Sequence, residues 1–115
     1  MDKHTLLTVR TAVEKEPGLI RYDYYDNHSK MACALGSVIP PRMRSKESIN
    51  AWLYLIGQGL NEDTMTSIYE ANDYVDFLTP VERRDHMLKW LDDQLAIIAE
   101  HETITSEAPH ELVLV

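Results

Sequence analysis

The stretch that begins at Thr79 constrains the fold of this chain more than any other. In Thr79-Pro80-Val81-Glu82 it combines a residue that can cap a helix, a proline at the first helical position and a glutamate three residues after the cap. Apolar residues follow at helical spacing, namely Val81, Leu88, Leu91, Leu95 and Ile98. A helix over residues 80–102 would be about 35 Å long at ~1.5 Å per residue. Such a helix is either the spine of a small domain or a projection that pairs with a second chain.

Apolar residues recur at helical spacing earlier in the chain as well. Residues 3–16 form one candidate helix, which Pro17-Gly18 ends. Residues 46–57 form another, with Ser45 in position to cap it. The residues expected on the inner faces of these two helices are Leu6, Val9, Ala12, Val13, Ile49, Trp52, Leu53 and Ile56.

Two shorter helices complete the pattern. Residues 31–38 are small and apolar, so we expect a short helix there that Pro40-Pro41 ends. Another begins at Asn61 or Asp63, either of which can cap it. Its apolar face would carry Met65, Ile68 and Tyr69. Residues 19–30 are aromatic and polar with little periodicity and predict an ordered loop.

These signals predict an all-α fold, a single-domain bundle of four to five helices over residues 1–102 with a long C-terminal helix. Residues 103–115 contain Thr103, Thr105, Ser106 and Pro109, which continue a helix poorly. We therefore expect an irregular tail that is flexible or docked. The expected core consists of Leu6, Val13, Cys33, Ile49, Trp52, Leu53, Ile68, Leu88, Leu91 and Leu95.

The charge of the chain is unevenly distributed. The formal net charge is −8, and no Lys or Arg follows Lys89, whereas six of the 19 acidic residues do. The negative charge of this segment repels nucleic-acid phosphates and attracts a basic surface. Alternatively, it serves solubility alone. Residues 46–57 and 63–71 are spaced like a helix-turn-helix, but the second helix offers no Lys or Arg for DNA. We therefore expect no direct nucleic-acid binding.

Membrane and secretory signals are missing from the sequence. No apolar run approaches the roughly 20 residues of a membrane span. The first residues, Met1 to Thr5, lack a signal-peptide pattern. The single cysteine, Cys33, excludes an intramolecular disulfide and a multi-thiolate zinc site. These features predict a cytoplasmic protein with no membrane partner.

Cys33 is the candidate nucleophile of the chain. A cysteine near a helix start can have a lowered pKa, and it then needs a base and an orienting group. His28 and Asp26 could fill these roles. The small apolar neighbours in residues 31–35 are instead typical of a buried cysteine. We expect no catalytic residue, with a small Cys33-dependent hydrolase as the alternative.

Metal and cofactor signals are weak. The histidines are scattered, and no two of them are four residues apart. Glu82 and His86 would supply two ligands at best. Asp23, Asp26 and His28 share a loop that lacks the glycine and the spacing of a calcium loop. The chain has no glycine-rich phosphate loop, so we expect no metal and no cofactor.

Tyrosines and acidic residues gather in two predicted loops. Tyrosine suits a protein interface, although it suits the edge of a small core equally well. The acids of the long helix would point outward and be free for a partner with a basic surface. The candidate partner-binding residues are Tyr22, Tyr24, Tyr25, Asp73, Tyr74, Asp76, Asp92 and Asp93. A variant of this function imitates nucleic acid with rows of carboxylates.

The C-terminal helix and tail predict self-association. The apolar end of the chain, Leu112 to Val115, needs a dry surface. In one arrangement two chains pair as a twofold homodimer that buries the end of the helix. In the other, a monomer folds its tail back onto its own helix.

Several short motifs resemble those of a known group of proteins. They are Cys33-Ala34-Leu35-Gly36, Asn72-Asp73, Thr79-Pro80-Val81-Glu82-Arg83-Arg84 and Trp90-Leu91. Over residues 3–95 the chain resembles small uncharacterised helical proteins of bacteria, notably actinobacteria, and of their phages. The resemblance implies a helical fold and a phage or prophage setting, and it carries over no catalytic residue. We therefore expect a non-enzymatic, acidic protein-interaction module that binds or inhibits a host protein in the host cytoplasm.

Overall fold

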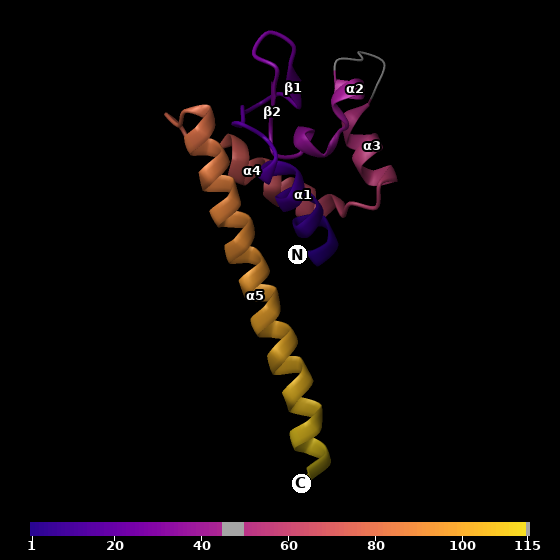
Figure 1. Cartoon of the computed structure of the whole chain (residues 1–115). Helices are drawn as coiled ribbons and strands as arrows, with labels where there is room; N and C mark the ends of the chain where they lie inside the picture. The colour runs from indigo at the N-terminus through magenta and orange to yellow at the C-terminus, as the bar shows by residue number, and fades with distance from the viewer. Residues whose placement is uncertain (45–49, 115) are drawn as a thin grey trace.

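The part of the chain that the structure describes forms five α-helices and one small hairpin (Figure 1). This computed structural model describes residues 1–44 and 50–114, with side chains up to residue 102. In chain order the elements are α1 (Lys3–Glu14), β1 (Tyr25–Asp26), β2 (Met31–Ala32), the 3₁₀ helix η1 (Gly36–Val38), α2 (Pro41–Arg44), α3 (Ala51–Gly57), α4 (Glu62–Asp73) and α5 (Pro80–Leu114). The predicted all-α class with a long C-terminal helix is confirmed.

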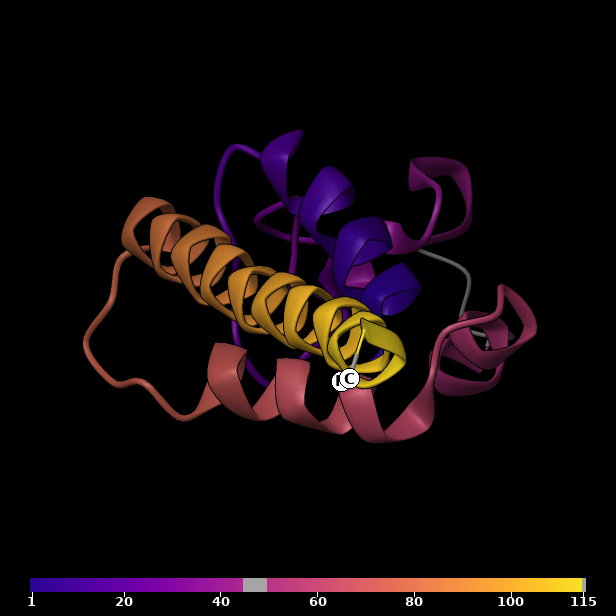
Figure 2. The same ribbon diagram turned by 90° about the horizontal axis from the view of Figure 1, so that it is seen from below.

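Helix α5 is the spine of the molecule and starts as its sequence predicts. The Thr79 amide donates to the Glu82 carboxylate at 3.0 Å, and the Glu82 amide donates to the Thr79 hydroxyl at 3.2 Å. This reciprocal pair is a capping box. Helix α1 lies on one side of α5 and α4 on the other (Figure 2). The side chains of Met87 and Leu91 are fully buried between them.

The expected helix end near residue 102 was wrong, because α5 continues to Leu114. Once a helix has formed, each further residue with an amide proton adds a hydrogen bond, whereas Thr and Ser cost less than about 0.7 kcal/mol each relative to Ala. Pro109, which costs about 3 kcal/mol inside a helix, has no such explanation. The last part of α5 extends beyond the other elements (Figure 1). The side chains of residues 103–115 lie outside the described residues, so their docking stays a prediction.

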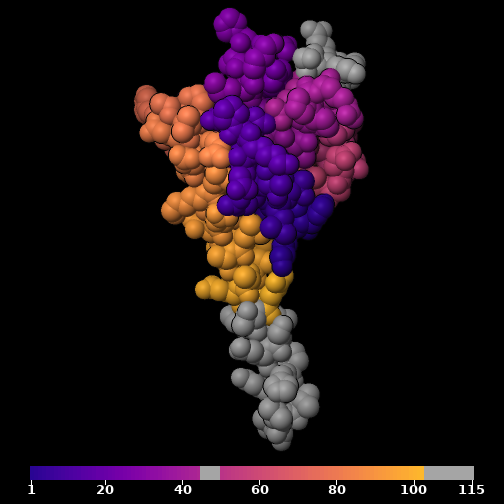
Figure 3. Space-filling model, in the orientation of Figure 1, coloured from indigo at the N-terminus to yellow at the C-terminus, as the bar shows by residue number. Residues whose placement is uncertain are grey.

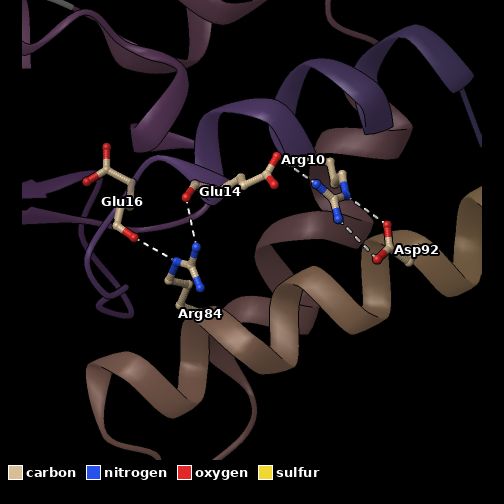
Figure 4. Close-up of polar contacts among 5 residues, drawn as sticks. All are labelled: Arg10, Glu14, Glu16, Arg84 and Asp92. Atoms are coloured by element: carbon tan, nitrogen blue, oxygen red, sulfur yellow. Dashed lines mark hydrogen bonds and ion pairs between the residues drawn. The ribbon is translucent and has the colours of Figure 1, made fainter.

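Helices α1 and α5 run antiparallel and are joined by polar contacts along their length. Arg84 of α5 donates to the main-chain oxygens of Glu14 and Glu16, both at 2.7 Å, at the end of α1 (Figure 4). Further along, Arg10 forms an ion pair with Asp92 at 2.8 Å. Figure 3 shows the two helices side by side on the molecular surface.

The core lies where α1, α4 and α5 meet the segment around Leu35. Of the residues expected there, five are buried, namely Leu6, Val13, Cys33, Ile68 and Leu91. Trp52, Leu88 and Leu95 pack against the core and are half-buried. Leu53 is 62% exposed, so its assignment to the core was wrong. Leu55, on another face of α3, is buried in its place.

The first residues of the helices agree only in part with the expected caps. Asn61 caps α4, as one of the two expected candidates. Asn50 caps α3, which therefore begins later than expected. The expected cap Ser45 and the expected core residue Ile49 lie outside the described residues. Pro41 opens α2 as its first residue, a position where the missing amide proton of proline costs nothing.

The helix expected over residues 31–38 was wrong. Met31 and Ala32 pair with β1 instead, and only Gly36–Val38 turn as a 3₁₀ helix. The Cys33 amide donates to the main-chain oxygen of Tyr24 at 3.2 Å. A Cβ atom on Gly36 would lie only 1.8 Å from that oxygen. This close approach holds residues 33–36 against the loop that contains Tyr24. Any residue with a side chain at position 36 would prevent the contact.

Candidate binding site

Two loops meet at the end of α4 and are tied to each other by side chains. Arg21, in the loop before β1, forms an ion pair with Asp76 and donates to the main-chain oxygen of Asp73 at 3.4 Å. The Tyr22 amide donates to the Asp73 carboxylate at 3.1 Å. The loop of residues 19–24 is therefore tied both to the last residue of α4 and to the loop of residues 74–79 that follows it.

Asn72 anchors this junction from inside the molecule. Its side chain is 1% exposed and donates to the main-chain oxygen of Ile20 at 2.9 Å, while its own oxygen accepts from the Ala34 amide at 3.1 Å. Its main-chain oxygen accepts from the guanidinium of Arg83. Arg83 is buried, and this burial lowers its pKa, with the nearby charge of Arg21 adding to the effect. A cation at this position suits the unpaired carbonyl groups at the end of α4.

Three aromatic side chains of the two loops face solvent. Tyr22 is 64% exposed, Tyr74 65% and Phe77 99%. Tyr22 and Phe77 have φ angles of 71° and 62°, in the left-handed region that bulky residues rarely adopt. This conformation costs about 1–2 kcal/mol per residue. We call the surface formed by Tyr22, Asp73, Tyr74, Asp76 and Phe77 the aromatic face.

A cavity of about 200 Å³ opens beside the aromatic face. It is lined by residues from the loop before β1, the segment after β2, α3 and α4, namely Tyr22, Asp23, Tyr24, Cys33, Leu35, Trp52, Tyr69 and Asp73. The rings of Trp52 and Tyr69 meet edge to face, with 6.4 Å between their centroids. The indole nitrogen of Trp52 donates to Glu62 at 3.2 Å, which orients the ring.

Burial is the main influence on the titratable groups of the cavity, and the negative charge of Asp73 adds to it. The pKa of the Tyr24 hydroxyl is raised, mainly by burial and further by neighbours that include Asp73. Burial raises the pKa of the Cys33 thiol to about 12, and the charge of Asp73 acts in the same direction. Both groups therefore stay neutral at neutral pH, chiefly because they are buried, and the contribution of Asp73 opposes negative charge in particular.

Cys33 and its expected partners are not arranged as a nucleophile with its base. The Cys33 sulfur is buried and accepts from the Gly36 amide at 3.3 Å. His28 is exposed in the hairpin turn, where its amide and that of Ser29 donate to Asp26. Among the described residues no hydrogen bond joins Cys33 to His28. With a pKa of about 12 the sulfur stays a thiol at neutral pH.

The structure brings together some of the expected partner-binding residues and separates others. Tyr22, Tyr24 and Asp73 line the cavity, whereas Tyr74 and Asp76 do not. Asp76 is joined to the loop before β1 by its ion pair with Arg21. Tyr25 lies in β1, is half-buried and is not among the lining residues.

The two acids of α5 do not fit the expectation that they are free for a partner. Asp92 forms an ion pair with Arg10 at 2.8 Å (Figure 4), and Asp93 forms one with Lys89 at 3.0 Å. The pKa of Asp92 is lowered, chiefly by its hydrogen bond from Arg10. Each carboxylate thus already has a basic partner within the chain. The periodicity of α5 placed both residues on outward faces. Lys89 lies four residues before Asp93 on the same helix, so that pair could be read from the sequence, whereas Arg10 reaches Asp92 from α1 and could not.

Two residues that line the cavity, Trp52 and Tyr69, were not expected at a binding site. They were expected on the inner faces of their helices, as core residues. Both pack against the core, but each also lines the cavity. The helical spacing of these residues is the same whether they pack in the core or line a cavity. The only signal in the sequence for a binding role was their chemistry, because each has a large ring with a polar tip.

The described residues offer no group of three or more His, Cys, Asp or Glu side chains that could hold a metal ion. Within the same part of the chain, no helix has both the length and the apolar character needed to cross a bilayer. No family model, curated protein or solved structure matches this chain.

Proposed function

We propose that this chain is a non-enzymatic protein-interaction module that binds a protein with a basic surface through the aromatic face. The observation that carries the proposal is the backbone of Tyr22 and Phe77. Both residues are large, exposed and held in a left-handed conformation. Strained backbone of this kind persists only where the surrounding structure enforces it, and it concentrates at functional sites. The guanidinium of Arg21 lies 4.8 Å from the centroid of the Tyr22 ring, whereas the Phe77 ring is 99% exposed, and the surface that remains exposed on both rings is available to a partner.

The acidic residues of the aromatic face support the choice of partner. The aromatic face contains Asp73 and Asp76, of which Asp76 is paired with Arg21, and the chain as a whole has a net charge of −8. Complementary charge accelerates encounter and suppresses wrong partners. Protein interfaces derive most of their affinity from a few large anchors such as aromatic side chains, whereas exposed charges around them contribute little affinity and act on encounter and specificity. In the phage or prophage setting that the resemblance implies, the partner is a protein of the host cytoplasm, which the module binds or inhibits.

The alternative of a Cys33-dependent hydrolase has less support. Its nucleophile would have to ionise from a thiol with a pKa of about 12. Its base, His28, forms no hydrogen bond with the thiol among the described residues. A buried, neutral cysteine instead behaves as a small apolar residue of the core.

The test compares exposed apolar residues on and off the aromatic face. Immobilised wild-type chain captures its partner from the native host, and a Phe77→Ser, Tyr74→Ser double variant should lose this capture. Leu7→Ser is the control, because Leu7 is also exposed, at 44%, but lies on α1. Binding should weaken as salt is raised. Retention of the partner by the double variant, or its loss from the Leu7 variant, would overturn the proposal.

A further inference from the structure

The cavity beside the aromatic face has walls of an unusual composition. Four of its lining residues are aromatic, namely Tyr22, Tyr24, Trp52 and Tyr69, and two are acidic, namely Asp23 and Asp73. The face of an aromatic ring carries negative potential and attracts a cation. Rings from three separate elements converge here, because Trp52 belongs to α3 and Tyr69 to α4.

The two carboxylates of the cavity form no ion pair among the described residues. Asp23 forms no hydrogen bond or ion pair with any described residue. The Asp73 carboxylate accepts from two uncharged amides, those of Tyr22 and of the Asn72 side chain. Its negative charge also acts on the nearby guanidinium groups of Arg21 and Arg83, of which Arg21 is paired with Asp76. Asp23 is therefore the carboxylate of the cavity that is most available to a cation of the ligand.

The volume of the cavity and its apolar lining residues restrict the size and the chemistry of the ligand further. An apolar cavity of about 150 Å³ admits benzene in another protein, so one of about 200 Å³ admits a group with several carbon atoms. Leu35 and the neutral thiol of Cys33 provide an apolar contact beside the charged residues. A ligand that matches both parts has an aliphatic stem and a compact positive charge.

We propose that this cavity binds the side chain of a lysine that the protein partner presents, with its ammonium group between the aromatic rings and the carboxylates of Asp23 and Asp73. The inference rests on the proposed function and names the group that the partner contributes. Lysine fits better than arginine, since its charge is compact and sits on a flexible four-carbon stem, whereas guanidinium is a planar fork. The cavity shares Tyr22 and Asp73 with the aromatic face, so one partner can engage both.

The experiment titrates the isolated chain with a lysine derivative while the indole N–H signals of its two tryptophans are followed by NMR. The probe is Nα-acetyl-lysine-N-methylamide, and the matched probe is the norleucine derivative, which lacks only the ammonium group. Trp52 lines the cavity, whereas Trp90 lies on α5 and serves as the internal reference. The lysine probe should shift the Trp52 signal with saturation and a Kd on the order of 1 mM. The norleucine probe and the Trp90 signal should show no saturating shift.

Variants locate the binding to the cavity. Asp23→Asn should weaken binding of the lysine probe by up to about fivefold, as loss of an exposed ion pair worth up to about 1 kcal/mol implies. Asp23 is exposed and unpaired among the described residues, so its replacement leaves the fold intact. Tyr69→Leu should weaken binding by a similar factor. Asp93→Asn is the matched control, because Asp93 lies on α5 and should leave the Kd unchanged.

Three results would overturn the inference. The first is an equal Trp52 shift with the norleucine probe, which would make the cavity merely apolar. The second is the absence of saturation with the lysine probe. The third is saturation with choline but not with the lysine probe, which would assign the cavity to a free quaternary ammonium compound. The titration contains no partner, so its failure leaves capture by the aromatic face standing, and loss of capture leaves a positive titration standing.

Discussion

At the scale of single residues, Gly36 determines how the site is built. Its backbone approaches Tyr24 so closely that any Cβ atom would overlap the Tyr24 carbonyl group. The contact places Tyr24 and Cys33 side by side at the cavity. The glycine is used here for its small size and not for an unusual backbone angle.

Replacing Gly36 with alanine should therefore destabilise the fold severely. We expect Gly36→Ala to lower the free energy of unfolding by more than about 3 kcal/mol, because the backbone of one segment must move. Urea denaturation measures the change. Gly57→Ala is the control, since no atom lies within 4 Å of a Cβ at that position. It should be neutral or stabilise by up to about 1 kcal/mol. Equal stability of the two variants would contradict the close approach.

Cys33 allows a prediction about pH. Its pKa is raised from 9.0 to about 12 in the folded chain. The unfolded chain therefore releases the thiol proton first, and stability should decrease as the pH rises from about 9 toward 12. A Cys33→Ser variant should lack this contribution. The thiol of the native chain should react with a disulfide reagent only as fast as the chain opens, and rapid labelling at pH 8 without denaturant would contradict a buried thiol.

At the scale of elements, the starts of the helices could be predicted better than their contacts. The capping box at Thr79 and the cap at Asn61 are local, so the sequence displays them directly. The segment after β2 is hydrogen-bonded to Tyr24 through the Cys33 amide, and no local sequence pattern indicates a contact of that kind. Its small apolar residues fit a helix and a buried turn equally well.

The same distinction explains how much of the site could be predicted. Tyr22, Tyr24 and Asp73 stand out as aromatic and acidic loop residues, whereas Trp52 and Tyr69 are hidden within helical patterns. Their shared cavity exists because α3 and α4 pack beside the loop of residues 19–24, which is a tertiary outcome. Leu55 is buried in place of Leu53 for the same reason, since the face that α3 buries depends on its neighbours.

Arg84 carries a prediction about the packing of α1 on α5. It donates to the carbonyl groups of Glu14 and Glu16 at the end of α1, where helix carbonyls lack partners of their own. Arg84→Met should lower the free energy of unfolding by roughly 2 kcal/mol, as for other hydrogen bonds that involve a charged group. Thermal or urea denaturation measures the loss. Lys89→Met, which removes an exposed ion pair, should change stability by less than about 0.5 kcal/mol.

At the scale of the whole molecule, α5 is longer than the body to which it is attached. Lys3, at the start of α1, forms an ion pair with Glu102 at 3.4 Å, which marks where α1 ceases to accompany α5. Helix α5 continues to Leu114 as one helix, so the backbone does not fold back in the way that the monomeric arrangement requires. The projecting segment is apolar at its end by sequence.

We therefore expect the chain to form a twofold dimer through the projecting part of α5. Sedimentation at micromolar concentration should give twice the chain mass, and deletion of residues 103–115 should return it to one chain mass. Ile97→Glu should weaken the dimer, because Ile97 is 49% exposed near the start of the projection. Val81→Glu is the control at the other end of the same helix. A single-chain mass for the full-length protein would rule the dimer out.

The antiparallel packing of α1 on α5 also has a kinetic consequence. The contacts of Lys3 with Glu102 and of Arg10 with Asp92 join residues 99 and 82 positions apart. Nearly the whole chain must therefore be brought into a closed loop before the first helix gains its main packing surface. Closing long loops is entropically costly and slows folding. During synthesis α1 emerges from the ribosome first, yet it has to wait with its apolar face unburied until residues 84–102 have followed.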